Sequence, residues 1–287
     1  MEIIFKQAID AHREGKLEEA EQFYRKVLKN QPTNLTALNN LGVLLSTLGI
    51  FSEAEKNYRK AIELKPTYID AHINLGNTLK DIGRIDEAEA AYKKAIELDP
   101  EHVTTHNNLG TMLLDIGRFD EAEASYRKAI EFKKDYAISH NNLGNVLKNL
   151  GRLNEAQMSY GKATDLQPDY IEAHYNLGII FYELKNYKEA AEKFKLINIK
   201  NSKELFLKCL LELDEQSNFY NQLDSLINQG VPNSIIGSLT SLAKIKYGIY
   251  RENIFCNNPL NYVLKTDLTK QCDFKNTFTN IAVDILS

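Results

Sequence analysis

Asparagines recur at a fixed spacing in this 287-residue sequence, and their side chains could hold another polypeptide. Five of them, called here the ladder asparagines, are 34 residues apart: Asn40, Asn74, Asn108, Asn142 and Asn176. Asn77 and Asn145 follow two of these by three residues. A carboxamide carries an acceptor oxygen and donor N–H groups, so it can pair with either side of a peptide bond. The series therefore predicts recognition of a peptide backbone rather than covalent chemistry.

The same series has a purely structural interpretation. Duplication copies a residue into every unit, and its amide can bond to a neighbouring helix instead of a ligand. A second set, called here the preceding asparagines, comes directly before three ladder asparagines: Asn39, Asn107 and Asn141. At 100° per residue both sets fall opposite the apolar stripe of a helix, on the face left for a ligand. The residue four positions earlier varies from Thr36 to Glu172 while the ladder asparagine does not, yet both interpretations stay open.

Other chemically capable side chains lack a working arrangement. Histidines recur once per unit, at His72, His106, His140 and His174. On separate helices they would lie too far apart to share one metal ion, so we interpret them as packing residues. Three cysteines, Cys209, Cys256 and Cys272, have no CxxC spacing, and no histidine follows them. With no phosphate loop, nucleophile elbow or HExxH motif, we expect no catalytic residue, no metal site and no cofactor.

The 34-residue period also carries the elements that must position the asparagines. Each full unit has a Leu-Gly pair, then an alanine and an aromatic residue, and three units close with a proline. In residues 69–102, Gly83 should end a first helix in a left-handed conformation. Asp86 should cap a second helix with Glu89 as its capping-box partner, and Pro100 should end it. Small residues such as Gly76 should mark a close approach of the two helices.

This period, with its small residues, aromatic and closing proline, resembles the tetratricopeptide repeat. The resemblance implies an all-α fold, a right-handed α-solenoid of about six helix–turn–helix units over residues 1–204. The expected units are residues 1–34, 35–68, 69–102, 103–136, 137–170 and 171–204. A helical cap or connector should follow over 205–250, with helices within 203–229 and 233–247. Residues 251–287 should form a short mixed segment, with a strand at 262–265 and a helix near 273–286, as at the beginning of a truncated domain.

Composition narrows the class of partner. The formal net charge is −4, which disfavours nucleic acid because phosphate binding needs clustered lysine and arginine. No stretch reaches the roughly 18–20 apolar residues that cross a bilayer, and the N-terminus has no apolar signal-peptide region. We therefore expect a cytoplasmic protein that binds a protein or peptide, without nucleic acid or membrane, and that could also self-associate through the open ends of the solenoid.

Two narrower resemblances concern function. The segment HNNLGNVLKNLGRLNEAQMSY is similar to the superhelical repeats of O-linked N-acetylglucosamine transferases. In that family the equivalent of the ladder asparagines holds substrate backbone. The stretch GSLTSLAKIKYGIY with the later NPLNYVLKTDL resembles a connector in bacterial proteins that join such repeats to an iron- and 2-oxoglutarate-dependent oxygenase. Iron of that type needs two histidines and a carboxylate, but residues 175–287 contain no histidine.

We therefore predict a non-catalytic interaction scaffold that binds an extended peptide in a groove lined by asparagines. The alternative is the substrate-recognition arm of a larger enzyme, an oxygenase or a glycosyltransferase, whose catalytic domain is absent from this chain.

Overall fold

The computed structural model describes residues 1–197, 199, 201–228 and 234–248. Its contacts divide the chain within one helix into two compact units, Met1–Ala173 and His174–Ser287. Every regular element of the described residues is an α-helix, as the sequence predicts. The strand predicted at 262–265, the helix near 273–286 and most of the oxygenase-like connector lie outside the described residues. The domain boundary predicted at residue 204 stays a prediction.

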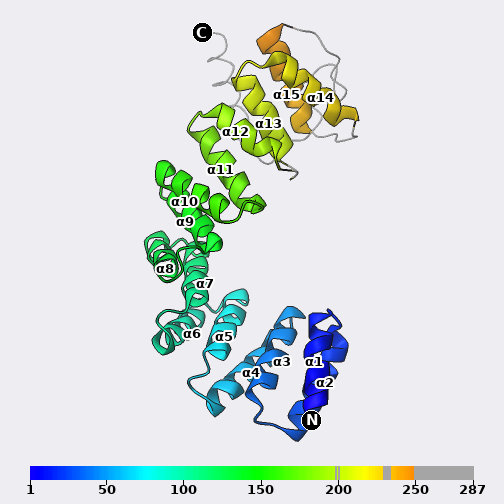
Figure 1. Ribbon diagram of the computed structural model, residues 1–287, viewed down its shortest axis with the longest axis vertical. Helices are drawn as coiled ribbons and strands as arrows, with labels where there is room; N and C mark the ends of the chain where they lie inside the picture. Colours follow the sequence, from blue (N-terminus) through cyan, green and yellow to red (C-terminus); the bar gives the residue numbers. More distant parts are fainter. Residues whose placement is uncertain (198, 200, 229–233, 249–287) are drawn as a thin grey trace, which may run out of the picture. The chain divides into compact units, whose positions relative to one another are not determined.

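The first unit is a row of helical hairpins (Figure 1). Its ten complete helices are α1 (Glu2–Arg13), α2 (Leu17–Asn30), α3 (Leu35–Thr47), α4 (Phe51–Leu64), α5 (Ile69–Asp81), α6 (Ile85–Leu98), α7 (Val103–Asp115), α8 (Phe119–Phe132), α9 (Ala137–Asn149) and α10 (Leu153–Leu166). Each odd-numbered helix packs against the even-numbered helix that follows it. Each hairpin then packs against the next, so the core runs from one hairpin to its neighbour.

The turn between the two helices of a hairpin depends on glycine. Gly83 has a φ of +78°, in the left-handed region where a side chain is strained, and the other hairpin turns of the first unit repeat it. The N–H of Arg84 donates to the carbonyl of Leu79 at 2.8 Å, which closes the end of α5. The prediction for Gly83 is therefore confirmed.

The capping box predicted at Asp86 and Glu89 is wrong. Helix α6 already begins at Ile85, and its N-cap Arg84 makes no side-chain capping bond. The left-handed glycine turns the chain directly into the next helix, so Asp86 falls inside the first turn, where its charge still favours the helix dipole. Glu89 pairs with Arg118 of the next hairpin instead. Ser52, Asp120 and Asn154, which the repeat places at the position of Asp86 and which the same pattern predicts as helix caps, also lie inside their helices.

The Leu-Gly pair lets the two helices of a hairpin meet around a tyrosine ring. A Cβ atom added to Gly76 would lie 2.8 Å from Cε1 of Tyr92, far inside normal contact, and Gly42 would meet Tyr58 at 2.5 Å. These tyrosines are among the largest fully buried side chains. The close approach predicted for Gly76 is thus made onto the ring of Tyr92.

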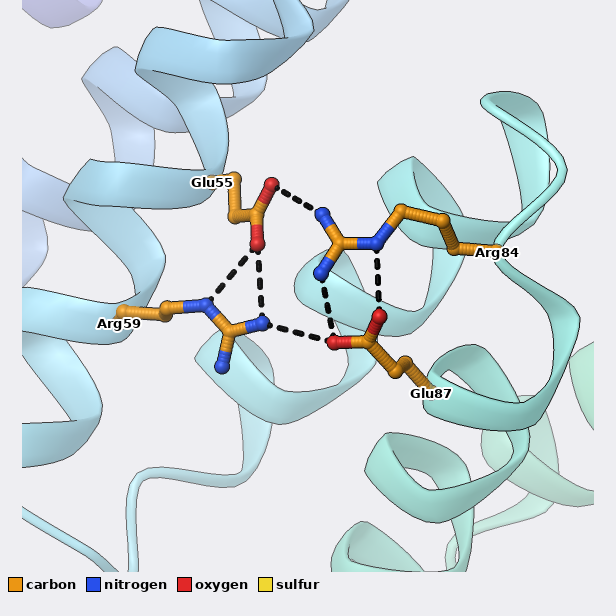
Figure 2. Close-up of polar contacts among 4 residues, drawn as sticks. All are labelled: Glu55, Arg59, Arg84 and Glu87. Carbon is orange, nitrogen blue, oxygen red and sulfur yellow. Dashed lines mark hydrogen bonds and ion pairs between the residues drawn. The ribbon is translucent and has the colours of Figure 1, made fainter.

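Charged side chains join neighbouring hairpins along their second helices. In Figure 2, the guanidinium groups of Arg59 and Arg84 lie between the carboxylates of Glu55 and Glu87. Arg84 donates to Glu55 at 2.7 Å and to Glu87 at 2.6 Å, and its hydrogen bonds lower the pKa of Glu87. Such exposed pairs are individually weak. Here they recur in register, and an arginine after each of three turn glycines ties one hairpin to the next: Arg84, Arg118 and Arg152.

The second unit contains two helices, α12 and α13, that are shorter than those of the first unit. Its helices are α11 (Ile171–Glu183, which begins in the first unit), α12 (Tyr187–Lys195), α13 (Ser202–Glu212), α14 (Gln216–Asn228) and α15 (Ser234–Tyr247). The last three lie where the sequence predicts helices after the repeats. Buried apolar residues of α13, α14 and α15, including Leu207, Phe219 and Leu239, form a core of their own. Burial raises the pKa of the Cys209 thiol to about 12, as suits a packing role rather than a nucleophile.

Candidate peptide-binding surface

The four ladder asparagines of the first unit lie on the first helices of successive hairpins, and all are half-buried: Asn40, Asn74, Asn108 and Asn142. Each donates its side-chain N–H to the preceding hairpin. The acceptor is the side-chain oxygen of Asn39 for Asn74 at 2.9 Å and that of Asn77 for Asn108 at 3.1 Å. Asn142 uses that of Asn107 at 3.2 Å, and Asn40 uses the hydroxyl of Tyr24 at 3.5 Å. The structural interpretation therefore holds for one half of each amide.

The other half of these amides is not used by the fold. The side-chain oxygens of Asn74, Asn108 and Asn142 accept no hydrogen bond from the part of the chain that the structure describes. Each amide is thus held by its donor while its acceptor remains available. An amide fixed in this way needs little ordering when a ligand arrives, which favours binding.

Asn77 and Asn145 are held from the opposite end, by tyrosines of the second helices. The hydroxyl of Tyr92 donates to Oδ1 of Asn77 at 2.6 Å, and that of Tyr160 donates to Oδ1 of Asn145 at 2.7 Å. Tyr92 is fully buried, and burial raises the pKa of its hydroxyl well above the usual range, so it remains a proton donor at neutral pH. The ring of each tyrosine packs on the glycine while its hydroxyl reaches the surface asparagine.

Asn74 and Asn77 line one shallow depression between α3 and α5. Its volume is about 220 Å³, and Tyr58, Val43 and Thr47 also line it. Asp81, one turn beyond Asn77, contributes an exposed carboxylate at its edge. A larger, mainly apolar depression of about 470 Å³ lies between the second helices α4 and α6, but it contains no asparagine.

The preceding asparagines are not on the open face, and this part of the sequence interpretation is wrong. Asn39 and Asn107 are 7 % exposed and Asn141 is 0 % exposed. They lie where one hairpin packs on the next, and Asn107 accepts from both Ser139 and Asn142. A helix in a solenoid is covered on two sides, by its own partner and by the next hairpin, so its open face is narrower than a single-helix projection implies.

The fifth ladder asparagine, Asn176, is half-buried on α11 within the second unit. Because Asn176 belongs to the other unit, the ladder of the first unit has four members, Asn40 to Asn142.

The recurring histidines are packing residues in three of the four units. Nε2 of His72 donates to the carbonyl of Pro66 at 2.9 Å, and His106 bonds to that of Pro100 at 2.8 Å. His140 repeats the contact with Lys134 at 2.9 Å, so the histidine ties the start of a first helix to the loop before it. Among the described residues, no three His, Cys, Asp or Glu side chains gather as metal ligands would. No helix there is long and apolar enough to cross a bilayer.

The sequence carries a signal for the tyrosine contacts that the interpretation missed. In three units the tyrosine hydroxyl donates a hydrogen bond to a polar residue on the first helix of the same hairpin: Asn77, Thr111 or Asn145. In the sixth unit the aromatic is Phe194, and the residue at the partner position is the apolar Ile179. The first two units have a tyrosine with Ile9 or Val43 at that position, so the pattern indicates the hydrogen bond only in the three units with a polar residue there.

A family comparison agrees with this architecture. The sequence model for the C-terminal domain of cilia and flagella-associated protein 70, a domain of tetratricopeptide repeats, matches residues 6–204. The chain belongs to this family. The match spans the repeats that the sequence predicts and ends at residue 204, within the first turn of α13, so α14 and α15 of this tetratricopeptide-repeat protein are outside it. No curated protein sequence matches the chain significantly.

Solved structures share the fold of this tetratricopeptide-repeat protein. PilF of Pseudomonas aeruginosa has a TM-score of 0.62 at 19% identity, covering 72% of this chain and 96% of its own. A tetratricopeptide repeat protein from Parabacteroides merdae has a TM-score of 0.59 at 18% identity, covering 84% and 98%. YrrB, described as a tetratricopeptide protein with an unusual peptide-binding site, has a TM-score of 0.50 at 23% identity, covering 68% and 97%. At these identities the similarity establishes the helical-repeat fold, which is typical of protein–protein interaction scaffolds.

Proposed function

We propose that residues 1–173 bind an extended peptide segment along the first helices, with the four ladder asparagines of this unit, Asn40 to Asn142, as backbone contacts. The observation that carries this proposal is the hydrogen bonding of the Asn74, Asn108 and Asn142 amides. Each N–H donates to the preceding hairpin, while each oxygen accepts no hydrogen bond from the described residues and remains available at the surface. Neighbouring helices pack about 8–10 Å apart, and an extended chain rises about 3.3 Å per residue. Successive asparagines therefore suit every third residue of a peptide. The peptide-binding site described for YrrB, a protein of the same fold, supports the proposal.

The charge of this face favours neutral or basic peptides. Asp81 and Asp115 end the first helices α5 and α7 and are exposed. Lys80 lies 3.6 Å from Asp81 and offsets part of its charge, whereas no ion pair is formed by Asp115 within the described residues. An acidic peptide would meet uncompensated carboxylates, because like charges across an interface are unfavourable.

The proposal is tested by replacing Asn74, Asn108 and Asn142 together with alanine. A peptide is first selected from a random linear library on the immobilised full chain, and its affinity is then measured by calorimetry. Each lost hydrogen bond is worth about 0.5–1.5 kcal/mol, so the triple variant should bind at least about tenfold more weakly. Helicity measured by circular dichroism should be unchanged.

Asn39→Ala is the matched control. It breaks the same contact between hairpins from the buried side, since Asn39 accepts the N–H of Asn74, but it leaves the surface oxygen of Asn74 in place. We expect it to weaken peptide binding far less than the triple variant does, because it loosens one amide but removes no surface hydrogen-bonding group. Equal affinity of the triple variant and the wild type, or selection of no peptide at all, would contradict the proposed function.

A further inference from the structure

Asn74 and Asn77 present opposite hydrogen-bonding groups to one depression. Asn74 uses its N–H internally, toward Asn39, which leaves its oxygen. The oxygen of Asn77 accepts two hydrogen bonds, from Tyr92 and from Asn108, which leaves its N–H groups. Neither remaining group is bonded to the part of the chain that the structure describes, and both residues line the depression between α3 and α5.

Tyr92, together with Asn108, determines which end of the Asn77 amide faces the ligand, and Tyr92 makes the shorter hydrogen bond. If that amide turned over, its N–H groups would face the Tyr92 hydroxyl, and the buried hydroxyl proton would lose its acceptor. A buried donor without a partner costs about 1–3 kcal/mol. The hydroxyl keeps its proton at neutral pH, so the orientation of Asn77 is fixed before any ligand binds.

An acceptor and a donor side by side match one residue of an extended peptide. In an antiparallel pair of strands, one residue exchanges both its N–H and its C=O with its partner. Side chains three residues apart on a helix are neighbours, with Cβ atoms about 5–6 Å apart. Asn74 could therefore accept the N–H of a peptide residue while Asn77 donates to the C=O of the same residue.

We infer that Asn74 and Asn77 bind a single residue of an extended peptide at both its N–H and its C=O, as the edge of a β-sheet would, and that Tyr92 is a positioning residue for this contact. This inference rests on the proposed function and refines it, because it assigns a donor as well as acceptors to the surface. Asn145 and Tyr160 repeat the positioning contact two hairpins further along. In the hairpin between them, Tyr126 holds the hydroxyl of Thr111, which already donates to the carbonyl of Asn107.

The test is Asn77→Asp, measured with the peptide selected on the wild-type full chain. Aspartate keeps an oxygen to accept from Tyr92 and Asn108 but has no N–H to donate. We expect about tenfold weaker peptide binding, with a thermal unfolding midpoint close to that of the wild type. Asn30→Asp adds the same charge at the exposed end of the second helix α2, away from the first helices, and should leave the affinity unchanged.

A second pair of variants separates positioning from stability. Tyr92→Phe and Tyr126→Phe each remove one buried hydroxyl and one hydrogen bond, so they should destabilise the fold similarly. Only Tyr92→Phe should weaken peptide binding, because only Tyr92 orients a surface amide. Wild-type affinity of Asn77→Asp, or equal effects of the two phenylalanine variants on binding, would overturn the inference. If the triple alanine variant still loses affinity in that case, the proposed function stands without it.

Discussion

Gly144→Ala should lower the free energy of unfolding by about 1–3 kcal/mol, whereas Gly161→Ala should raise it by about 0.5–1 kcal/mol. Both glycines lie inside helices of the same hairpin, α9 and α10. A Cβ atom at Gly144 would lie 2.6 Å from the ring of Tyr160, which is fully buried and cannot move aside, whereas one at Gly161 would meet nothing within 4 Å. The opposite signs follow because alanine favours helix wherever there is room for it.

Urea unfolding followed by circular dichroism measures both changes on the full chain. Gly161→Ala serves as the control, because it makes the same chemical change without the ring contact. A stabilising effect of Gly144→Ala would show that the tyrosine ring does not pack on the glycine, and the described geometry of the hairpin would then be wrong.

Tyr126→Ala should destabilise the protein by about 3–5 kcal/mol, and Tyr126→Phe by only about 0.5–1.5 kcal/mol. Tyr126 is 0 % exposed and packs against Gly110, so alanine leaves a cavity at the centre of its hairpin. Phenylalanine fills the same volume and loses only the 3.0 Å hydrogen bond to Thr111. The sixth unit already has phenylalanine at this position, Phe194, fully buried.

Thermal and urea unfolding of the two variants give the comparison. If phenylalanine were as damaging as alanine, the hydroxyl rather than the ring would dominate the stability of the hairpin. If both were neutral, the hairpin core would not depend on this side chain at all.

Much of the architecture could be predicted from the sequence because it depends on local conformation. The glycine of each hairpin turn adopts a left-handed conformation that other residues rarely adopt. The buried face of a helix is formed by residues only three or four positions apart. The turn at Gly83 and the positions of the helices after the repeats could therefore be predicted from the sequence. The capping box failed for the same local reason, since the glycine turn starts the next helix before Asp86 is reached.

Contacts between hairpins were harder to predict because they join residues about 30 positions apart. Glu55 and Glu89 fit an ordinary pairing within one helix, and only the stacked structure brings them to Arg84 and Arg118. The hydrogen bonds from the ladder asparagines to the preceding hairpin could not be predicted for the same reason, because they too join residues distant in the sequence. A single-helix projection placed Asn39 on the open face, where it would be if no second hairpin covered it.

The most direct measurement is a nuclear magnetic resonance titration of the full chain with the selected peptide, following the side-chain amide signals of asparagine. The signals of Asn74, Asn77 and Asn108 should move together and saturate at the affinity found by calorimetry, while the backbone signal of Gly161 should stay in place. Shifts confined to the depression between α4 and α6, with the asparagine signals unmoved, would contradict a peptide-binding role for the ladder.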